Sequence, residues 1–276
     1  MAEILKPDLC IIGAGALGTA LAVAARQRGL VTFLLDRGQD EAGDPEHGAL
    51  HRAAFAASAA RAQAFRTAGQ LGLDNAAPKL NFKAIAAHAT TLAASAAPRV
   101  SVERLTALGV TLLSGTPVFS DRQTLRIGET TLKPRHIILA TGATPLVPDI
   151  PGLADIPYFT PDTIFDNMRK LSHLLVIGGG AEALELAQAY RRLGSDVTLV
   201  PQGQVLPDFD SEMQAILLRE LREEGLAILD GADVTAIVTR KQGTGVTLRH
   251  VDGREGSLDI SHVLVASGRL PQFDAA

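Results

Sequence analysis

The stretch Asp8-Leu9-Cys10-Ile11-Ile12-Gly13-Ala14-Gly15-Ala16-Leu17-Gly18 decides the fold of this chain. Its apolar run leads into three glycines spaced G-x-G-x-x-G, which predicts a strand, a tight turn and a helix that ends before Gly29. In this pattern Gly13 permits the turn, Gly15 lets a pyrophosphate approach the backbone, and Gly18 lets helix and strand pack closely. The next predicted strand, residues 30–35, ends at Asp36, 23 residues after Gly13, where a ribose-binding carboxylate is expected.

The second half of the chain repeats this opening. An apolar strand over residues 174–177 leads into Gly178-Gly179-Gly180-Ala181-Glu182-Ala183, then a helix to Gly194 and a strand over 196–200. Alanine stands at the third glycine position, which the pattern allows. The duplication predicts two dinucleotide crevices in one α/β chain.

Composition narrows the function classes. The chain has 276 residues, 46% of them hydrophobic, with a net charge of −4 and no Lys-rich or Arg-rich run, so a nucleic-acid partner is not expected. The single cysteine, Cys10, excludes an intrachain disulfide and a cysteine-rich zinc site, and its place in the first strand predicts a buried, inert thiol. No metal site is expected, since His47 and His51 lack a further ligand outside an acidic loop.

Residues 9–25 carry no charge, as a signal peptide or a short membrane span would. Glu3, Lys6 and Asp8 precede this stretch instead of a net-positive region, and three glycines interrupt it. We therefore expect a cytoplasmic protein with no membrane partner.

The rest of the chain gives the domain division. Helices are predicted over 49–68, 82–97 and 101–108, followed by a strand at 110–113, a hairpin over 124–132 and the strand that ends at Ala140-Thr141-Gly142. Prolines then cluster from 148 to 157, as in a linker. Residues 1–150 and 151–270 are the two expected domains, each a three-layer, Rossmann-like unit with a parallel sheet and a small antiparallel appendage, the first of them incomplete at its C-terminal side.

Two such motifs, with Ala140-Thr141-Gly142 between them and Gly268-Arg269-x-Pro271 after the second, resemble the pyridine nucleotide-disulfide oxidoreductases. Within that family the mercuric reductase and dihydrolipoyl dehydrogenase group is most similar. The resemblance spans essentially the whole chain and implies FAD on the first crevice and NAD(P)H on the second. The implied FAD residues are Gly13, Gly15, Gly18, Asp36, Thr116, Thr141 and Gly142. The implied nicotinamide-cofactor residues are Gly178, Gly180, Ala183, Glu185, Gly268 and Arg269, with Glu185 in the catalytic role.

The departures from the family pattern concern the electron path. The redox-active Cys-x4-Cys is absent after Asp36, so disulfide or mercuric reduction cannot run through a dithiol of this chain. The lysine that follows it in the family aligns near Gly48, which predicts that Glu185 lacks a cationic partner. Glu182 stands where the family is apolar. We expect it to face solvent at the helix start, and the alternative is that it repels the cofactor phosphates.

Two further departures concern the cofactors. Pro201 and Gln202 follow the strand at 196–200, where an NAD enzyme has an acid and an NADP enzyme an arginine, so the sequence does not indicate which cofactor is preferred. The family's Gly-Asp segment that binds the FAD ribityl chain, and its dimerisation domain, would follow Gln272, whereas the sequence ends at Ala276.

The primary hypothesis is an FAD-dependent NAD(P)H oxidoreductase without a dithiol relay, in which hydride passes from nicotinamide to flavin and on to an unidentified small-molecule or protein acceptor. The alternative is a non-catalytic dinucleotide-binding remnant, or a fragment that needs a missing C-terminal part. Monomer and dimer are left open.

Overall fold

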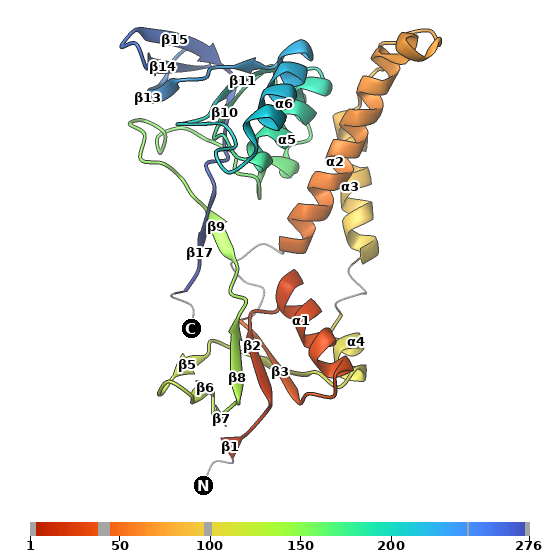
Figure 1. Cartoon of the computed structure of the whole chain (residues 1–276), viewed down its shortest axis with the longest axis vertical. Coiled ribbons are helices and arrows are strands. Elements are labelled where there is room, and N and C mark those ends of the chain that lie inside the picture. The colour runs from red at the N-terminus through yellow and green to blue at the C-terminus, as the bar shows by residue number, and fades with distance from the viewer. Residues whose placement is uncertain (1–3, 38–44, 97–100, 242, 274–276) are drawn as a thin grey trace. The chain divides into compact units, whose positions relative to one another are not determined.

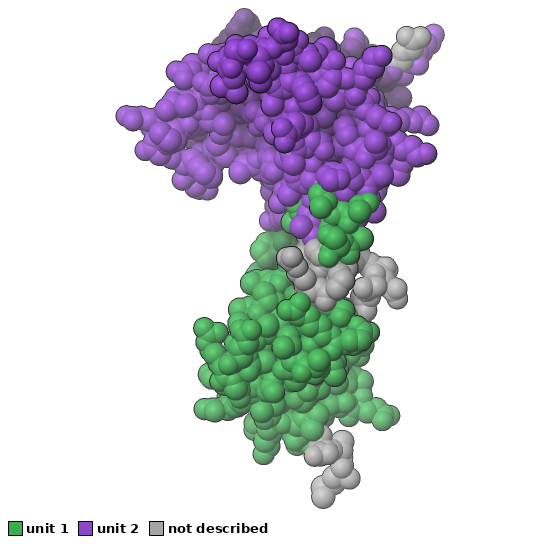
Figure 2. Space-filling view, turned by 90° about the vertical axis from the view of Figure 1, so that its right-hand side faces the viewer, with its two compact units in different colours: residues 1–49, 91–144, 270–276 green, residues 50–90, 145–269 purple. Residues whose placement is uncertain are grey.

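The computed structural model describes residues 4–37, 45–96, 101–241 and 243–273, which form two compact units (Figures 1 and 2). One unit comprises residues 1–49, 91–144 and 270–276, and the other comprises residues 50–90 and 145–269. None of the helices in the described ranges is both long enough and apolar enough to cross a membrane.

The first unit is built on a parallel sheet of four strands in the order β4-β3-β2-β8 (Thr111–Ser114, Thr32–Asp36, Leu9–Ile12 and His136–Leu139). Leu9 of β2 lies opposite Thr32 on one side and His136 on the other. All four strands run the same way, so their carboxyl ends share one edge of the sheet. That edge is where a doubly wound sheet binds its ligand.

Two further layers cover this sheet. Helices α1 (Ala16–Gln27) and α4 (Val102–Ala107) pack on one face, where Ala22 and Leu105 join Ile11 in the core. The other face packs on a small sheet in the order β1-β7-β6-β5 (Ile4–Leu5, Thr130–Leu132, Leu125–Ile127 and Val118–Phe119). β6 and β7 form the predicted antiparallel hairpin.

The second unit repeats this architecture. Its parallel sheet has the order β12-β11-β10-β16 (Ala227–Ile228, Asp196–Val200, His173–Ile177 and His262–Val265), and its antiparallel sheet has the order β13-β14-β15 (Ala232–Thr239, Thr244–His250 and Glu255–Ile260). Helices α5 (Ala181–Arg192) and α6 (Ser211–Glu223) cover the opposite face. Asp210 caps α6 through its side chain, as a residue before a helix start often does. The predicted α/β class with two three-layer, Rossmann-like units is confirmed.

Two long helices from the first half of the sequence belong to the second unit for most of their length. They are α2 (Pro45–Arg66) and α3 (Phe82–Ala96), with a short 3-10 helix at Ala68–Leu71 after α2. Phe55 of α2 packs on Tyr190 of α5, with ring centroids 4.9 Å apart. Alanine-rich α2 buries Ala59 and Ala62 in the same core. The spatial units therefore differ from the halves 1–150 and 151–270, whose assignment as FAD and NAD(P)H domains stays a prediction.

The boundary between the units passes through a pair of strands. β9 (Ala143–Pro145) and β17 (Arg269–Pro271) form a two-stranded ribbon, and each runs from one unit into the other. A further 3-10 helix, Ile164–Asp166, precedes β10 and places Ile164 in the core.

Candidate functional site

The first crevice lies where β2 ends and α1 begins. Gly13 has φ +111°, and a Cβ built on it would lie 2.1 Å from the Ala140 carbonyl oxygen. A Cβ on Gly18 would lie 1.8 Å from the Gly13 oxygen, so both positions exclude any side chain. Gly15 is the N-cap of α1 and offers no side chain to the free amides of the first turn. These amides and the helix dipole favour a bound anion at this end of α1.

The other residues expected at this crevice follow neighbouring strands. Asp36 is the last residue of β3 and pairs in register with Ser114 of β4. Thr141 and Gly142 follow β8, and Gly142 has φ +79°. The structure thus brings Gly13, Asp36 and Thr141 to one edge of the sheet. Thr116 is exposed in the connection from β4 to β5.

The second crevice repeats this arrangement at α5. Gly178 has φ +137°, its Cβ would lie 2.1 Å from the Ala266 oxygen, and its amide donates to the Val200 oxygen at 2.9 Å. Gly180 is the N-cap of α5, and a Cβ there would meet no atom within 4 Å. Ala183 is fully buried, as the third position of the pattern requires.

A charged cluster surrounds the start of α5. Arg52 of α2 forms an ion pair with Glu182, and its Nε lies 3.4 Å from Oε2 of Glu185. The expectation that Glu185 lacks a cationic partner is therefore wrong. Glu182, which was expected to face solvent, is partly exposed and is also paired with Arg52. Residue 52 lies four positions after Gly48 on α2, and positions four apart share a helix face. Arg52 thus brings a cation to Glu185 from a position one helical turn after the one where the lysine was expected.

Arg269 contributes a second ion pair to this region. Its two terminal nitrogens lie 2.8 and 3.1 Å from the two carboxylate oxygens of Asp162. This pairing raises the pKa of Arg269, and the charge of Glu182 acts in the same direction. Gly268, beside it, follows β16 with φ +111°. Arg52 and Asp162 were both missed by sequence reasoning, because their partners lie more than 100 positions away.

The end of β11 carries no charge that would select a cofactor. Val200 and Pro201 are buried, and Gln202 has φ +55°. A Cβ on Gly179 would lie 3.0 Å from the Pro201 ring, so this turn packs closely on the glycine loop. Neither an acid nor an arginine stands here to choose between a ribose hydroxyl and a 2′-phosphate.

Cys10 is the second residue of β2 and lies two residues before the end of that strand at Ile12. It is fully buried, and burial raises the pKa of its thiol to about 12. A thiol with that pKa stays protonated near neutral pH and is a poor nucleophile. It cannot take the place of the missing cysteine pair.

Comparison with known proteins identifies the family. The family model described as pyridine nucleotide-disulphide oxidoreductase matches residues 7–276. The chain belongs to this family. It is 32% identical over 270 residues to a mercuric reductase of Streptomyces lividans, which covers 95% of this chain and 56% of the relative. It is 28% identical over 278 residues to a dihydrolipoyl dehydrogenase of Haloferax volcanii, which covers 97% and 58%.

A comparison with solved structures shows that the fold of this chain is shared by a known flavoprotein. The HOCl-induced flavoprotein disulfide reductase RclA from Escherichia coli superposes with a TM-score of 0.76 at 21% identity, over 96% of this chain and 57% of that one. This chain therefore spans a little over half the length of the relatives it matches. The cofactors of this family are FAD and NAD(P)H, the pair expected from the sequence.

Proposed function

We propose that this chain carries the FAD-binding and NAD(P)H-binding parts of an oxidoreductase that passes electrons from NAD(P)H to an acceptor without a dithiol of its own. The observation that carries the proposal is the duplicated crevice. In both units the first glycine faces a carbonyl oxygen that leaves no room for a Cβ, and a glycine caps a helix whose first amides are free.

The residues of the crevices fit dinucleotides. The open space at Gly180 leaves room for phosphate oxygens above the first turn of α5, where backbone amides would donate to them. Asp36 is placed to accept from ribose hydroxyls at the edge of the first sheet. Bound FAD supplies a centre that accepts hydride from the nicotinamide ring.

Arg52 makes the second crevice compatible with an anionic cofactor. Glu182 and Glu185 both lie in the first two turns of α5, and without a cation they would repel a pyrophosphate. Arg52 reduces their combined charge from −2 to −1, and its Nε lies close enough to attract the Glu185 carboxylate. We assign Glu185 to the nicotinamide end of the site and Arg52 to positioning it.

The acceptor, the choice between NADH and NADPH, and the oligomeric state can each be measured directly on the purified protein. The neutral end of β11 favours similar affinity for NADH and NADPH. The cytoplasmic location stays a prediction.

The test is the visible spectrum of the purified chain, with FAD titrated in. A flavin band that bleaches anaerobically with NADH or NADPH supports the proposal, and the relative rates give the cofactor preference. Absence of a band and of FAD uptake, with NADH still bound to the second unit, would instead favour the dinucleotide-binding remnant or a fragment that needs a further part.

A further inference from the structure

A cavity of about 240 Å³ lies at the end of α5 that is opposite to the cofactor crevice. It is lined by Gln63, Arg66, Arg191, Arg192, Gly194 and Glu224, all of them in the second unit. The 12 residues of α5 separate it from Gly180 by about 18 Å along the helix axis. It therefore does not belong to the dinucleotide site.

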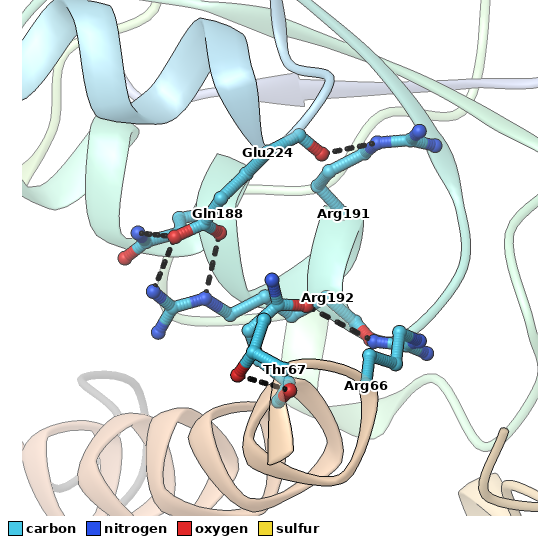
Figure 3. A network of polar contacts seen from close by, with 7 residues as sticks. Arg66, Thr67, Gln188, Arg191, Arg192 and Glu224 are labelled. Atoms are coloured by element: carbon cyan, nitrogen blue, oxygen red, sulfur yellow. Dashed lines mark hydrogen bonds and ion pairs between the residues drawn. The ribbon is translucent and has the colours of Figure 1, made fainter. Parts of the chain in front are cut away.

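The arginines of the cavity differ in how they are neutralised (Figure 3). Arg192 forms a two-pronged pair with Glu224, at 2.7 Å from Nε and 2.5 Å from Nη2, and Gln188 donates to the same carboxylate. Arg191 lies 3.2 Å from the exposed carboxylate of Asp196. Both guanidinium groups thus have an acidic partner.

Among the described residues, Arg66 has carbonyl partners only. Its Nη1 donates to the Arg192 backbone oxygen at 2.6 Å and lies 3.4 Å from Oε1 of Gln63. No carboxylate in the described ranges pairs with it. Its bond to the helix end offsets the negative end of the α5 dipole, which would otherwise oppose an anion here.

Lys170 brings another cation to the same place. A Cβ built on Gly194, which lines the cavity, would lie 3.7 Å from the Lys170 Nζ. Lys170 is exposed and has no ion pair within the described part of the chain. The charged side chains near Gly194 are therefore four cations and two carboxylates, which gives a net charge of +2. The cations are Arg66, Lys170, Arg191 and Arg192, and the carboxylates are Asp196 and Glu224.

Comparison with the equivalent positions of the first unit shows which of these cations has a structural role common to both units. In the first unit, Arg26 of α1 lies against Gly109 and donates to the backbone oxygens of Leu108 and Leu30. In the second unit, Arg191 lies against Gly225 and donates in the same way to the backbone oxygens of Glu224 and Ser195. Arg191 is thus part of the shared architecture. The residue that corresponds to Arg192 is Gln27, and a Cβ at Gly29, the counterpart of Gly194, would meet no atom within 4 Å. The other cations are additions of the second unit.

We propose that this cavity is an oxyanion site that binds a phosphate group, either as inorganic phosphate or as the phosphoryl group of a small metabolite. Guanidinium groups donate paired hydrogen bonds to phosphate oxygens, and an ammonium adds a point charge. Partial burial at the junction of α2 and α5 lowers screening by solvent. The volume is below that of typical pockets for larger ligands and suits a small anion rather than a dinucleotide. This site does not depend on the proposed electron transfer.

The test measures binding of inorganic phosphate by calorimetry on the full chain, with chloride at equal ionic strength as reference. Arg66→Gln and Lys170→Met should each weaken phosphate binding about tenfold, since each removes one charge-assisted contact. Arg61→Gln is the matched control, because Arg61 is exposed on the same helix, and it should leave binding unchanged. Arg66→Gln also removes a hydrogen bond to α5 and could disturb folding, whereas Lys170 is exposed. Lys170→Met therefore tests the site independently of that hydrogen bond.

Phosphate could also bind at the glycine turns, so the variants assign the site. Binding that is the same in wild type, Arg66→Gln and Lys170→Met would overturn the proposal, as would equal binding of chloride. Glycerol 3-phosphate distinguishes the two sources of the group. If glycerol 3-phosphate binds as tightly as phosphate and with the same dependence on Lys170, the site accepts a phosphorylated metabolite. If phosphate binds and glycerol 3-phosphate does not, the ligand is the free ion.

Discussion

The Nε atom of Arg52 lies 3.4 Å from the Glu185 carboxylate, and the same guanidinium is paired with Glu182. One cation from α2 thus forms ion pairs with two carboxylates in the first two turns of α5. All three side chains are partly exposed, so the arrangement acts on the charge of the crevice more than on stability.

Replacement of this cation tests its role. Arg52→Met should weaken NADH or NADPH binding several-fold, because one charge near the pyrophosphate changes binding by about 1 kcal/mol. The urea unfolding midpoint should change little. Arg52→Lys should restore most of the affinity, measured by fluorescence titration. Adding Glu182→Gln to Arg52→Met should also restore it, and a double variant as weak as Arg52→Met would contradict the charge argument.

Two glycines of the second crevice should differ in role, so that replacing one lowers stability and replacing the other lowers cofactor affinity. Gly178→Ala should destabilise the protein by about 2–4 kcal/mol, since its Cβ would meet the Ala266 oxygen and its φ is positive. Gly180 has a φ of −79°, and a Cβ there would meet no atom within 4 Å, so the Gly180→Ala variant should fold normally. Its added methyl group would occupy the space expected for the cofactor phosphates, so it should bind nicotinamide cofactors less tightly. Urea unfolding and cofactor titration measure the two effects. Equal stability of both variants would refute this division.

Cys10 should be unreactive in the folded protein. Burial raises the pKa of its thiol to about 12, so little thiolate forms at pH 8 and reagent cannot reach it. A disulfide reagent such as DTNB should label no thiol at pH 8 and one thiol per chain in 6 M guanidinium chloride. Rapid labelling without denaturant would show that β2 opens readily.

His262 should make stability depend on pH. Its ring stacks on Phe159, with centroids 6.0 Å apart, and burial lowers its pKa from the ordinary value of 6.5. The unfolded chain then binds the proton more readily than the folded one, so this stability is present above pH 6.5 and is lost as pH falls through the folded pKa. His262→Asn should flatten the pH dependence of the urea midpoint between pH 7 and 5. The exposed His136, changed to Asn, is the control.

Local sequence patterns predicted most of the fold. The strands that lead into Gly13 and Gly178, the hairpin predicted at 124–132 and the helix predicted at 101–108 all depend on residues close together in the chain. Gly13, Gly18 and Gly178 could be predicted because their close backbone contacts permit no other residue.

Packing over long sequence distances could not be predicted in this way. The alanine-rich pattern of α2 predicts a helix but does not show that Phe55 meets Tyr190, 135 positions away. Arg52 was missed for the same reason. A family lysine was expected near Gly48, and only the helix geometry shows that residue 52 lies on the same face.

The membership of α2 and α3 in the second unit has a consequence for how such a gene can evolve. The chain visits the first unit, then the second, then the first again, and repeats the excursion, so neither unit is a continuous piece of sequence. A gene split near residue 145 would release a second half without Phe55, Ala59 and Ala62, and Tyr190 would meet water. Recombination between relatives should therefore preserve residues 50–90 together with residues 145–269.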